Sequence, residues 1–206
     1  MKEAFILGLS LCGITNSFWG VPFLLSFFLG GRRGAFYGTT SFLLGNFTSY
    51  IVILAFLLYW GERIIGAIPS LENLFALLIS IVSLLCGFFL ILSALTMNII
   101  LEKITREYLL NGWVIYLFGF LVGLYLGKSI EGAGIYFNNL FPSDKAKFVL
   151  ASFIFSFGTF LSPLYFLTPF FRFFRREVVT VGEVRFWDAL AGVVFLLTGA
   201  AFLFLR

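Results

Sequence analysis

Six long runs of the chain contain no charged residue, and they constrain the fold more than any other feature. A helix needs about 20 apolar residues to cross a bilayer core about 30 Å thick. Because charges are costly in hydrocarbon, such runs predict an all-α integral membrane protein with six transmembrane helices, forming a single transmembrane domain over residues 1–206. The runs cover residues 4–29, 34–60, 74–100, 109–127, 148–171 and 189–205.

Composition excludes several classes of function. The chain is 61% apolar and 12% charged, whereas an ordinary soluble domain has about 25% charged residues. It contains no His, so no imidazole is there to bind a metal or to relay a proton near neutral pH. No zinc motif, phosphate loop or nucleophile with its base is recognisable. We therefore expect no enzymatic activity, no metal, no cofactor and no nucleic-acid partner; the expected partner is the lipid bilayer.

Two segments hint at an internal repeat. CGFFLILSAL in the third run and AGVVFLLTGA in the sixth align Gly87 with Gly192 and Ser93 with Thr198. Each half then has three spans, an odd number, so equivalent spans point in opposite directions. The pattern predicts two inverted three-helix halves, residues 1–108 and 109–206, an arrangement that many transporters use to build a site near the midplane.

The stretch CGITNSFWGVP, residues 12–22, places polar residues and a proline inside the first run. Pro22 lacks the N–H that would bond the carbonyl of Phe18, so the helix is expected to kink or open there. The freed carbonyl needs a partner in hydrocarbon. One interpretation is a solute site at a broken helix, and the other is a simple kink whose polar residues hold two helices together. The first interpretation assigns solute binding to Thr15, Asn16, Ser17 and Trp19, and the helix break to Gly20 and Pro22.

A second stretch, FGTFLSPLYFLTP at residues 157–169, repeats this theme in the fifth run. Pro163 and Pro169 each free the carbonyl four residues earlier. Two interrupted helices in different halves favour a transport path, with simple kinks as the equal alternative. In the second run, Asn46 is either part of the site or a hydrogen-bond partner of the first helix. The predicted site gains Asn46, Thr159 and Ser162, and the predicted breaks gain Pro163 and Pro169.

The two cysteines, Cys12 and Cys86, both lie within apolar runs. A thiol pair for electron transfer is one interpretation, and two buried structural cysteines are the other. Neither residue belongs to a Cys-x-x-Cys motif. A disulfide would need their Cα atoms within about 7 Å.

The distribution of Lys and Arg gives an orientation. Eight of these residues lie in the loops after the first, third and fifth runs, and six lie on the other side. Because cytoplasmic loops carry an excess of Lys and Arg, the bias predicts a multi-pass plasma-membrane protein with both termini outside the cytoplasm.

Two stretches carry a resemblance to a known family. The second run opens with LGGRRGAFYGTTSFLLGN, and the chain closes with FFRFFRREVVTVGEVRFWDALAGVVFLLTGAAFLFL. With the six runs, they resemble the lysine-exporter (LysE) superfamily of amino-acid efflux proteins, which implies inverted repeats and ion-driven export of a small solute. The family's Pro-Gly-Pro has no counterpart after Thr15. More distantly, the chain is similar to the cytochrome-c-biogenesis thiol electron transporters, but Trp19 and Leu164 stand at their cysteine positions.

These observations predict a small-solute transporter, an exporter of an amino acid or a similar solute by alternating access. Because no Asp or Glu lies within any of the six runs, we expect a neutral, zwitterionic or small anionic solute rather than a cation held by a salt bridge. The alternative is a non-transporting subunit that anchors or assembles a larger membrane complex. A homo-oligomer is a further expected partner arrangement, and thiol electron transfer is the third and weakest function.

Overall fold

The computed structural model describes residues 1–10, 31–60, 68–96, 107, 111–173 and 181–204, which are almost entirely helical and contain no strand. Residues 2–10 form a helix at the N-terminus. The other helices are α2 (Gly31–Trp60), α4 (Ile68–Thr96), α6 (Gly112–Tyr125), α7 (Gly127–Leu140), α8 (Lys145–Phe173) and α9 (Val181–Phe204). The predicted all-helical class is confirmed for this part of the chain.

Four of these helices are long and apolar enough to cross a membrane, namely α2, α4, α8 and α9. α6 and α7 are together long and apolar enough for a fifth span, but their axes are bent by 67°. They count as one span only if the bent pair crosses the membrane as a broken helix. The fourth predicted run ended at residue 127, whereas helix continues to Leu140 beyond the bend. Residues 11–30, most of the first predicted run, lie outside the described part, so the number of six spans stays a prediction.

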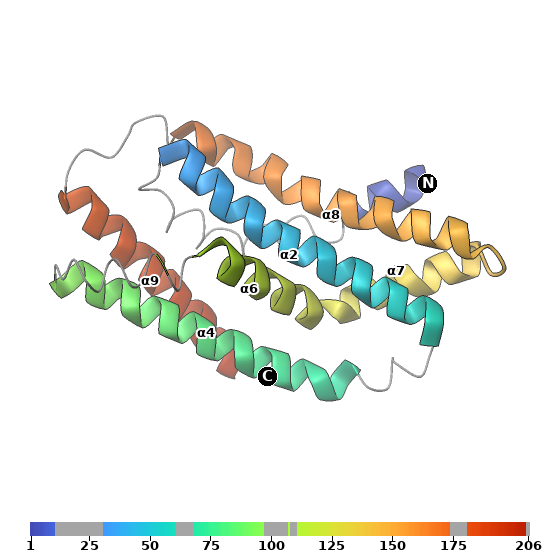
Figure 1. Ribbon diagram of the computed structural model, residues 1–206, viewed down its shortest axis with the longest axis horizontal. Helices are drawn as coiled ribbons and strands as arrows, with labels where there is room; N and C mark the ends of the chain where they lie inside the picture. Colours follow the sequence, from blue (N-terminus) through green and yellow to red (C-terminus); the bar gives the residue numbers. More distant parts are fainter. Residues whose placement is uncertain (11–30, 61–67, 97–106, 108–110, 174–180, 205–206) are drawn as a thin grey trace.

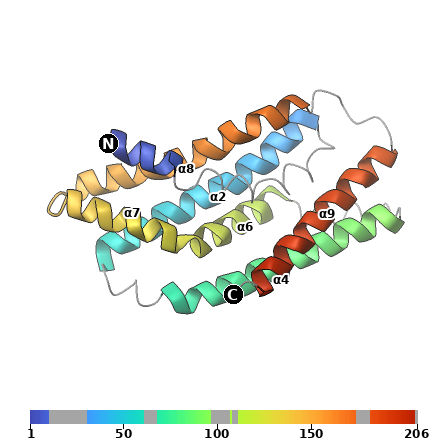
Figure 2. The ribbon, with the colours of Figure 1, turned by 180° about the vertical axis from the view of Figure 1, so that it is seen from behind.

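The helices form two neighbouring groups, as Figures 1 and 2 show. α2 lies along α8, α4 lies along α9, and α6 packs between α2 and α4. Two buried clusters fill the bundle, and α2 contributes to both. One cluster joins α2, α4, α6 and α9 through Phe42, Ile79, Ile115 and Phe195. The other joins α2, α7, α8 and residues 2–10 through Tyr50, Phe137, Phe148, Phe155 and Ala4.

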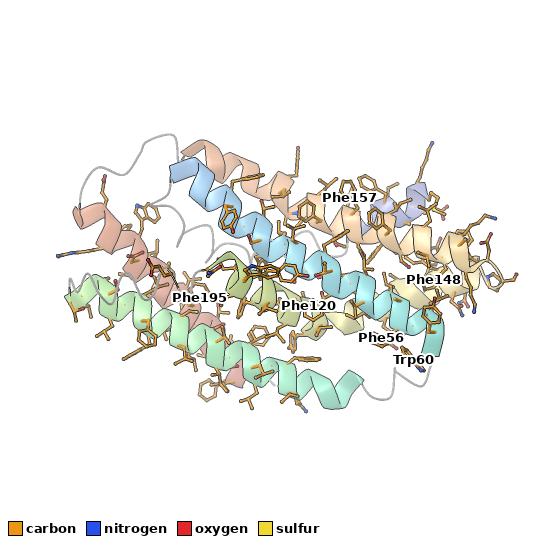
Figure 3. The ribbon with its side chains drawn as sticks, in the orientation of Figure 1. Phe56, Trp60, Phe120, Phe148, Phe157 and Phe195 are labelled. Atoms are coloured by element: carbon orange, nitrogen blue, oxygen red, sulfur yellow. The ribbon has the colours of Figure 1, made fainter. Side chains whose placement is uncertain are left out.

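Large apolar side chains also cover the outside of the bundle. Leu44 on α2, Leu85 on α4 and Leu197 on α9 are all exposed, as expected for helices that face lipid. Trp60 is exposed at the end of α2, where its ring stacks on Phe56 at 4.9 Å between centroids (Figure 3). An amphipathic ring at a helix end suits the interface between lipid and water.

The helix interruption in the described residues lies between α6 and α7, and not at a proline. Leu126 ends α6 and precedes α7 without a side-chain cap. By contrast, α8 is one helix that includes both Pro163 and Pro169. The role of these prolines as breaks or gates remains a prediction.

The last predicted run is corrected at its start. It began at residue 189, but α9 begins at Val181, and its apolar stretch Arg185–Phe204 includes Asp188. Asp188 is only 3% exposed. Because nothing places the membrane boundary along α9, the prediction that no acidic residue lies within a span stays a prediction. The charge-free run ends after Asp188 when it is followed towards the N-terminus, whereas the helix continues through Asp188 to Val181.

Candidate functional site

One face of α2 is polar and fully buried. Thr39, Asn46 and Ser49 have 0 to 2% of their surface exposed, and their spacing of seven and three residues puts them on the same side of a helix. The opposite face carries the exposed Leu44. The buried polar face therefore looks into the protein and away from the lipid.

Asn46 is the most unusual of these residues. Both polar atoms of its amide, Oδ1 and Nδ2, are buried and have no hydrogen-bond partner among the described residues. An unsatisfied buried polar group costs about 1–3 kcal/mol, and such groups are rare in folded proteins. The fold thus keeps an amide whose donor and acceptor capacity is not used within the described structure.

The glycine at position 123 of α6 makes room for this amide. A Cβ at Gly123 would lie 3.1 Å from Asn46 Oδ1 and would overlap Ser49 Oγ. The Ser49 hydroxyl donates to the backbone carbonyl of Asn46 at 2.7 Å. Asn46 and Ser49 consequently face α6 within one turn of the bend at Leu126.

A similar polar face lies on α8, but most of its hydroxyls are paired. Thr159 donates to the carbonyl of Ser156 at 2.7 Å. Ser162 donates across a helix contact to the carbonyl of Leu9 at 2.9 Å. Ser156 Oγ is buried and has no partner among the described residues. This face therefore closes against residues 2–10 as the face of α2 closes against α6.

The two polar faces share a sequence motif, Phe-x-x-Gly-x-Phe-x-Ser. It occurs as FLLGNFTS at residues 42–49 of α2 and as FSFGTFLS at residues 155–162 of α8. In both copies the first Phe, the Gly, the residue after it and the Ser are buried, while the second Phe is partly buried. The repeat predicted from the sequence involved the third and sixth runs, whereas this motif lies in the second and fifth.

The contacts made by the two copies also correspond. Gly119 of α6 packs on the backbone of Phe42, with Phe42 O, C and Cα nearest to its would-be Cβ. Gly8 packs on the backbone of Phe155, and the same three atoms of Phe155 are nearest. Two pairs of helices therefore cross through glycine in the same way.

The reverse side of each crossing corresponds as well. Gly45 faces the carbonyl of Tyr116 and the backbone of Gly119 and Phe120. Gly158 faces the carbonyl of Phe5 and the backbone of Gly8 and Leu9. Each residue of α6 here is 111 positions after its counterpart in residues 2–10, and each α8 residue is 113 positions after its counterpart in α2.

The third helix pair, α4 with α9, is centred on Gly87 and Gly192. A Cβ at Gly87 would lie 2.7 Å from the carbonyl oxygen of Gly192, and a Cβ at Gly192 would lie 2.9 Å from that of Gly87. Leu196 flanks the first contact and Ile91 flanks the second. Since Gly199 packs on Ser80, the two helices run antiparallel.

Equivalent residues also meet where α2 packs on α8. Phe47 and Phe160 are the second Phe residues of the two motif copies, and their rings meet edge to face at 6.2 Å. Phe47 packs in addition against Phe153 at 5.6 Å. The α2–α8 contact therefore brings a residue against its own counterpart, as the Gly87–Gly192 contact does.

The structure places three of the predicted site residues. Asn46 lies against α6, whereas Thr159 and Ser162 lie on the face of α8 that packs on residues 2–10. The side chain of Pro169 and residues Thr15, Asn16, Ser17, Trp19, Gly20 and Pro22 lie outside the described residues. Pro163 is buried within α8.

The described residues contain no cluster of three or more His, Cys, Asp or Glu side chains that would hold a metal ion. Cys86 is a free, buried thiol on α4, and Cys12 lies outside the described residues. The proposed thiol pair is therefore untested.

Comparison with protein-family models, with curated proteins and with solved structures finds no match to this chain. The resemblance to the LysE superfamily accordingly stays a prediction that rests on sequence stretches. The function has to be argued from the geometry of the buried polar faces and the helix contacts.

Proposed function

We propose that the chain is a small-solute membrane transporter whose two halves are inverted three-helix repeats, and that Asn46 binds the solute. The single observation that carries the proposal is the amide of Asn46, which is buried beside the crossing of α2 and α6 and has no hydrogen-bond partner among the described residues. A transporter needs a polar group inside the bilayer that is available to its solute, and the described packing leaves this one available.

The matched contacts support the inverted arrangement of the halves. Where a two-fold axis passes through a contact, a residue meets its own equivalent. Gly87 with Gly192 and Phe47 with Phe160 have this property. An axis between antiparallel helices such as α4 and α9 would lie in the membrane plane, which is the relation found in inverted-repeat transporters.

The chemistry of Asn46 supports a neutral or zwitterionic solute. An amide offers two donors and one carbonyl acceptor with two lone pairs, and it carries no charge. Ser49 lies beside it with a hydroxyl that already donates to the backbone, so its oxygen retains acceptor capacity. We propose a small solute with at least one donor and one acceptor, such as an amino acid, exported by alternating access.

Transport by purified protein in liposomes tests this function. Counterflow of a panel of radiolabelled amino acids of different charge would be measured for the wild type, Asn46→Ala and Leu44→Ala. Leu44→Ala is the matched control, since it truncates a lipid-facing residue two positions away on the same helix. We expect at least a tenfold loss of exchange in Asn46→Ala and little change in Leu44→Ala. Equal exchange by all three proteins would contradict the assignment of Asn46.

One contact favours the alternative role of a membrane anchor or assembly subunit. The hydroxyls of Thr48 on α2 and Tyr116 on α6 are 2.9 Å apart and hydrogen-bond across the helix interface. Polar contacts of this kind hold helices together without any transport. An absence of exchange for every solute in the panel, with folded protein recovered from the liposomes, would favour this alternative.

A further inference from the structure

The break between α6 and α7 brings the end of one helix against the start of another inside the bundle. α6 and α7 have 14 residues each, with Leu126 alone between them, and their axes are bent by 67°. The break therefore lies at the middle of the pair. If the pair crosses the membrane as one broken helix, the break is near the midplane, where transporters with interrupted helices bind their solutes.

The two helix ends at this break offer opposite chemistry. The last carbonyl groups and the first N–H groups of a helix have no partner within that helix. The end of α6 therefore presents acceptors with a partial negative charge, and the start of α7 presents donors with a partial positive charge. The bend takes the N–H groups of α7 out of line with the carbonyl groups of α6. A ligand with a donor group and an acceptor group side by side suits such a break.

The start of α7 differs from the starts of α6 and α8. Asn111 caps α6 and Asp144 caps α8, each by accepting a backbone N–H of the first turn. Leu126, at the corresponding position before α7, makes no side-chain cap. The first turn of α7 contains no acidic residue and includes Lys128, although a basic residue is unfavourable at this end of a helix. An anion bound here would offset both features.

The amide of Asn46 is an independent observation at the same break. It is 2% exposed, and neither of its polar atoms has a partner among the described residues. Its Oδ1 lies 3.1 Å from a Cβ placed on Gly123. Gly123 precedes Leu126 by three residues, which is about 4.5 Å along the helix. Both α6 and α7 pack on α2, so the helix that carries Asn46 runs past the break (Figure 1).

We propose that this break binds a zwitterionic α-amino acid. The carboxylate accepts hydrogen bonds from the first N–H groups of α7 and from Nδ2 of Asn46. The ammonium group donates to the last carbonyl groups of α6 and to Oδ1 of Asn46. One residue separates the two helix ends, and one carbon separates the two charged groups of the ligand. A zwitterion has no net charge, so its burial requires no oppositely charged side chain. The inference rests on the proposed transport function, for which it specifies the substrate.

Binding by the wild-type protein in nanodiscs tests the two charged groups separately. The probes are tritiated glycine, L-serine, L-leucine and L-phenylalanine, and the one that binds most tightly is displaced by three unlabelled analogues. Its carboxamide lacks the carboxylate, its N-acetyl derivative lacks the ammonium group, and its β-homologue has one more carbon between the two. We expect each analogue to bind at least tenfold more weakly than the parent amino acid, because each leaves one helix end without its partner.

Two variants locate the site on the protein. Asn46→Ala should weaken binding of the amino acid at least tenfold, with Leu44→Ala as its lipid-facing control. Leu126→Asn introduces a neutral capping side chain for the N–H groups of α7. It should weaken binding of the amino acid at least tenfold and remove most of its advantage over the carboxamide. Leu140→Asn is the matched control, since it makes the same substitution at the exposed last residue of α7, and it should leave binding unchanged.

Two results would overturn the proposal, and both come from the wild type, whose fold no substitution disturbs. The first is equal binding of the amino acid and its carboxamide, and the second is the failure of all four amino acids to bind. If exchange in liposomes still depends on Asn46 in either case, the transport function stands and only the amino-acid site at the break is rejected. A preference for the amino acid over its carboxamide that Leu126→Asn removes, without exchange of any solute, would keep the site and reject transport.

Discussion

α2 and α8 carry the same motif on the same buried face, yet they use their polar groups differently. On α8 the residue after the motif glycine is Thr159, whose hydroxyl bonds its own helix, and Ser162 bonds the carbonyl of Leu9. On α2 the corresponding residues are Asn46, whose amide has no partner in the described structure, and Ser49, which bonds its own helix.

This difference distinguishes the motif positions that pack the helices from the position that we assign to solute binding. Both helices keep the glycine that allows a close crossing and the phenylalanines that fill the core, so these positions are set by the fold. The residue after the glycine is buried in both copies but differs in chemistry between them. α2 has there an amide without a partner in the described part of the chain, and α8 has a hydroxyl that donates to the carbonyl of Ser156. The solute site is therefore expected to be asymmetric and to lie nearer α2.

The largest expected effect concerns the glycine crossings. Gly119→Ala would drive a methyl group into the backbone of Phe42, and Gly8→Ala would do the same at Phe155. Overpacking of this kind costs about 1–3 kcal/mol, and backbone atoms cannot move aside easily. We expect both variants to lose about 2–3 kcal/mol of unfolding free energy in SDS titrations of the protein in mixed micelles.

Gly132→Ala is the control for this experiment. Nothing lies within 4 Å of a Cβ at Gly132, which is in α7. Replacing an unhindered helical glycine by alanine stabilises by up to about 1 kcal/mol, so this variant should unfold no earlier than the wild type. If Gly119→Ala is destabilised and Gly8→Ala is not, the two crossings are not equivalent and the comparison fails.

The second expected effect contrasts Asn46 with Thr159. Asn46→Leu removes an unsatisfied amide, and we expect it to raise the unfolding free energy by about 1 kcal/mol while abolishing solute exchange. Thr159→Val removes a paired hydroxyl and should lower it by about 0.5–1.5 kcal/mol. Both values come from SDS titration beside the exchange assay. A destabilised Asn46→Leu protein would mean that the amide is part of the packing.

The third effect concerns the two serines of the motif. Ser162→Ala loses a bond between helices, and such bonds in membrane proteins contribute about 0.6 kcal/mol on average. Ser49→Ala loses a bond within one helix and should cost less. The difference would be measured as the shift in SDS midpoint at constant slope. A larger loss for Ser49→Ala would reverse the order that the hydrogen bonds predict.

The smallest effect lies at the start of α8. Asp144 accepts the backbone N–H of Lys147 at 3.0 Å and pairs with its ammonium at 2.9 Å. The hydrogen bond from the Lys147 side chain, with that from its backbone, holds the pKa of Asp144 below its ordinary value. A lowered pKa means that this stabilisation is present above the ordinary pKa and is lost as the pH falls through the lowered one.

Asp144→Asn tests this contribution. The variant should reduce the pH dependence of unfolding below about pH 4 and change stability little at pH 7. The matching position, 113 residues earlier, is Gly31, the first residue of α2, which has no side chain to offer. A variant with the same acid dependence as the wild type would show that Asp144 does not contribute to it.

Much of the helical architecture could be predicted from charge-free runs, because hydrocarbon excludes charge and helices satisfy their own backbone. The run at residues 34–60 matches α2 within three residues. α7 was missed since its sequence includes Lys128, Glu131 and two asparagines, which a search for apolar runs rejects. The start of α9 was missed for the same reason at Asp188.

The candidate site was predictable in part. Asn46, Thr159 and Ser162 were selected as polar residues at mid-depth, and the structure buries all three. Which of them keeps an unused hydrogen-bonding group could not be predicted, because Thr and Ser hydroxyls can bond the carbonyl three or four residues earlier whereas the amide of Asn46 depends on its neighbours. The role of Gly123 beside Asn46 likewise depends on which helices are adjacent.

The sidedness of four exposed positions tests the inverted relation of the halves most directly. Single cysteines at Lys2, Trp113, Ser143 and Gly182, in a Cys12→Ser, Cys86→Ala background, would be labelled with a membrane-impermeant maleimide in oriented vesicles. Lys2 and Trp113 are counterparts 111 positions apart. The account predicts that Lys2 and Ser143 label from one side and Trp113 and Gly182 from the other. Labelling of Lys2 and Trp113 from the same side would contradict it.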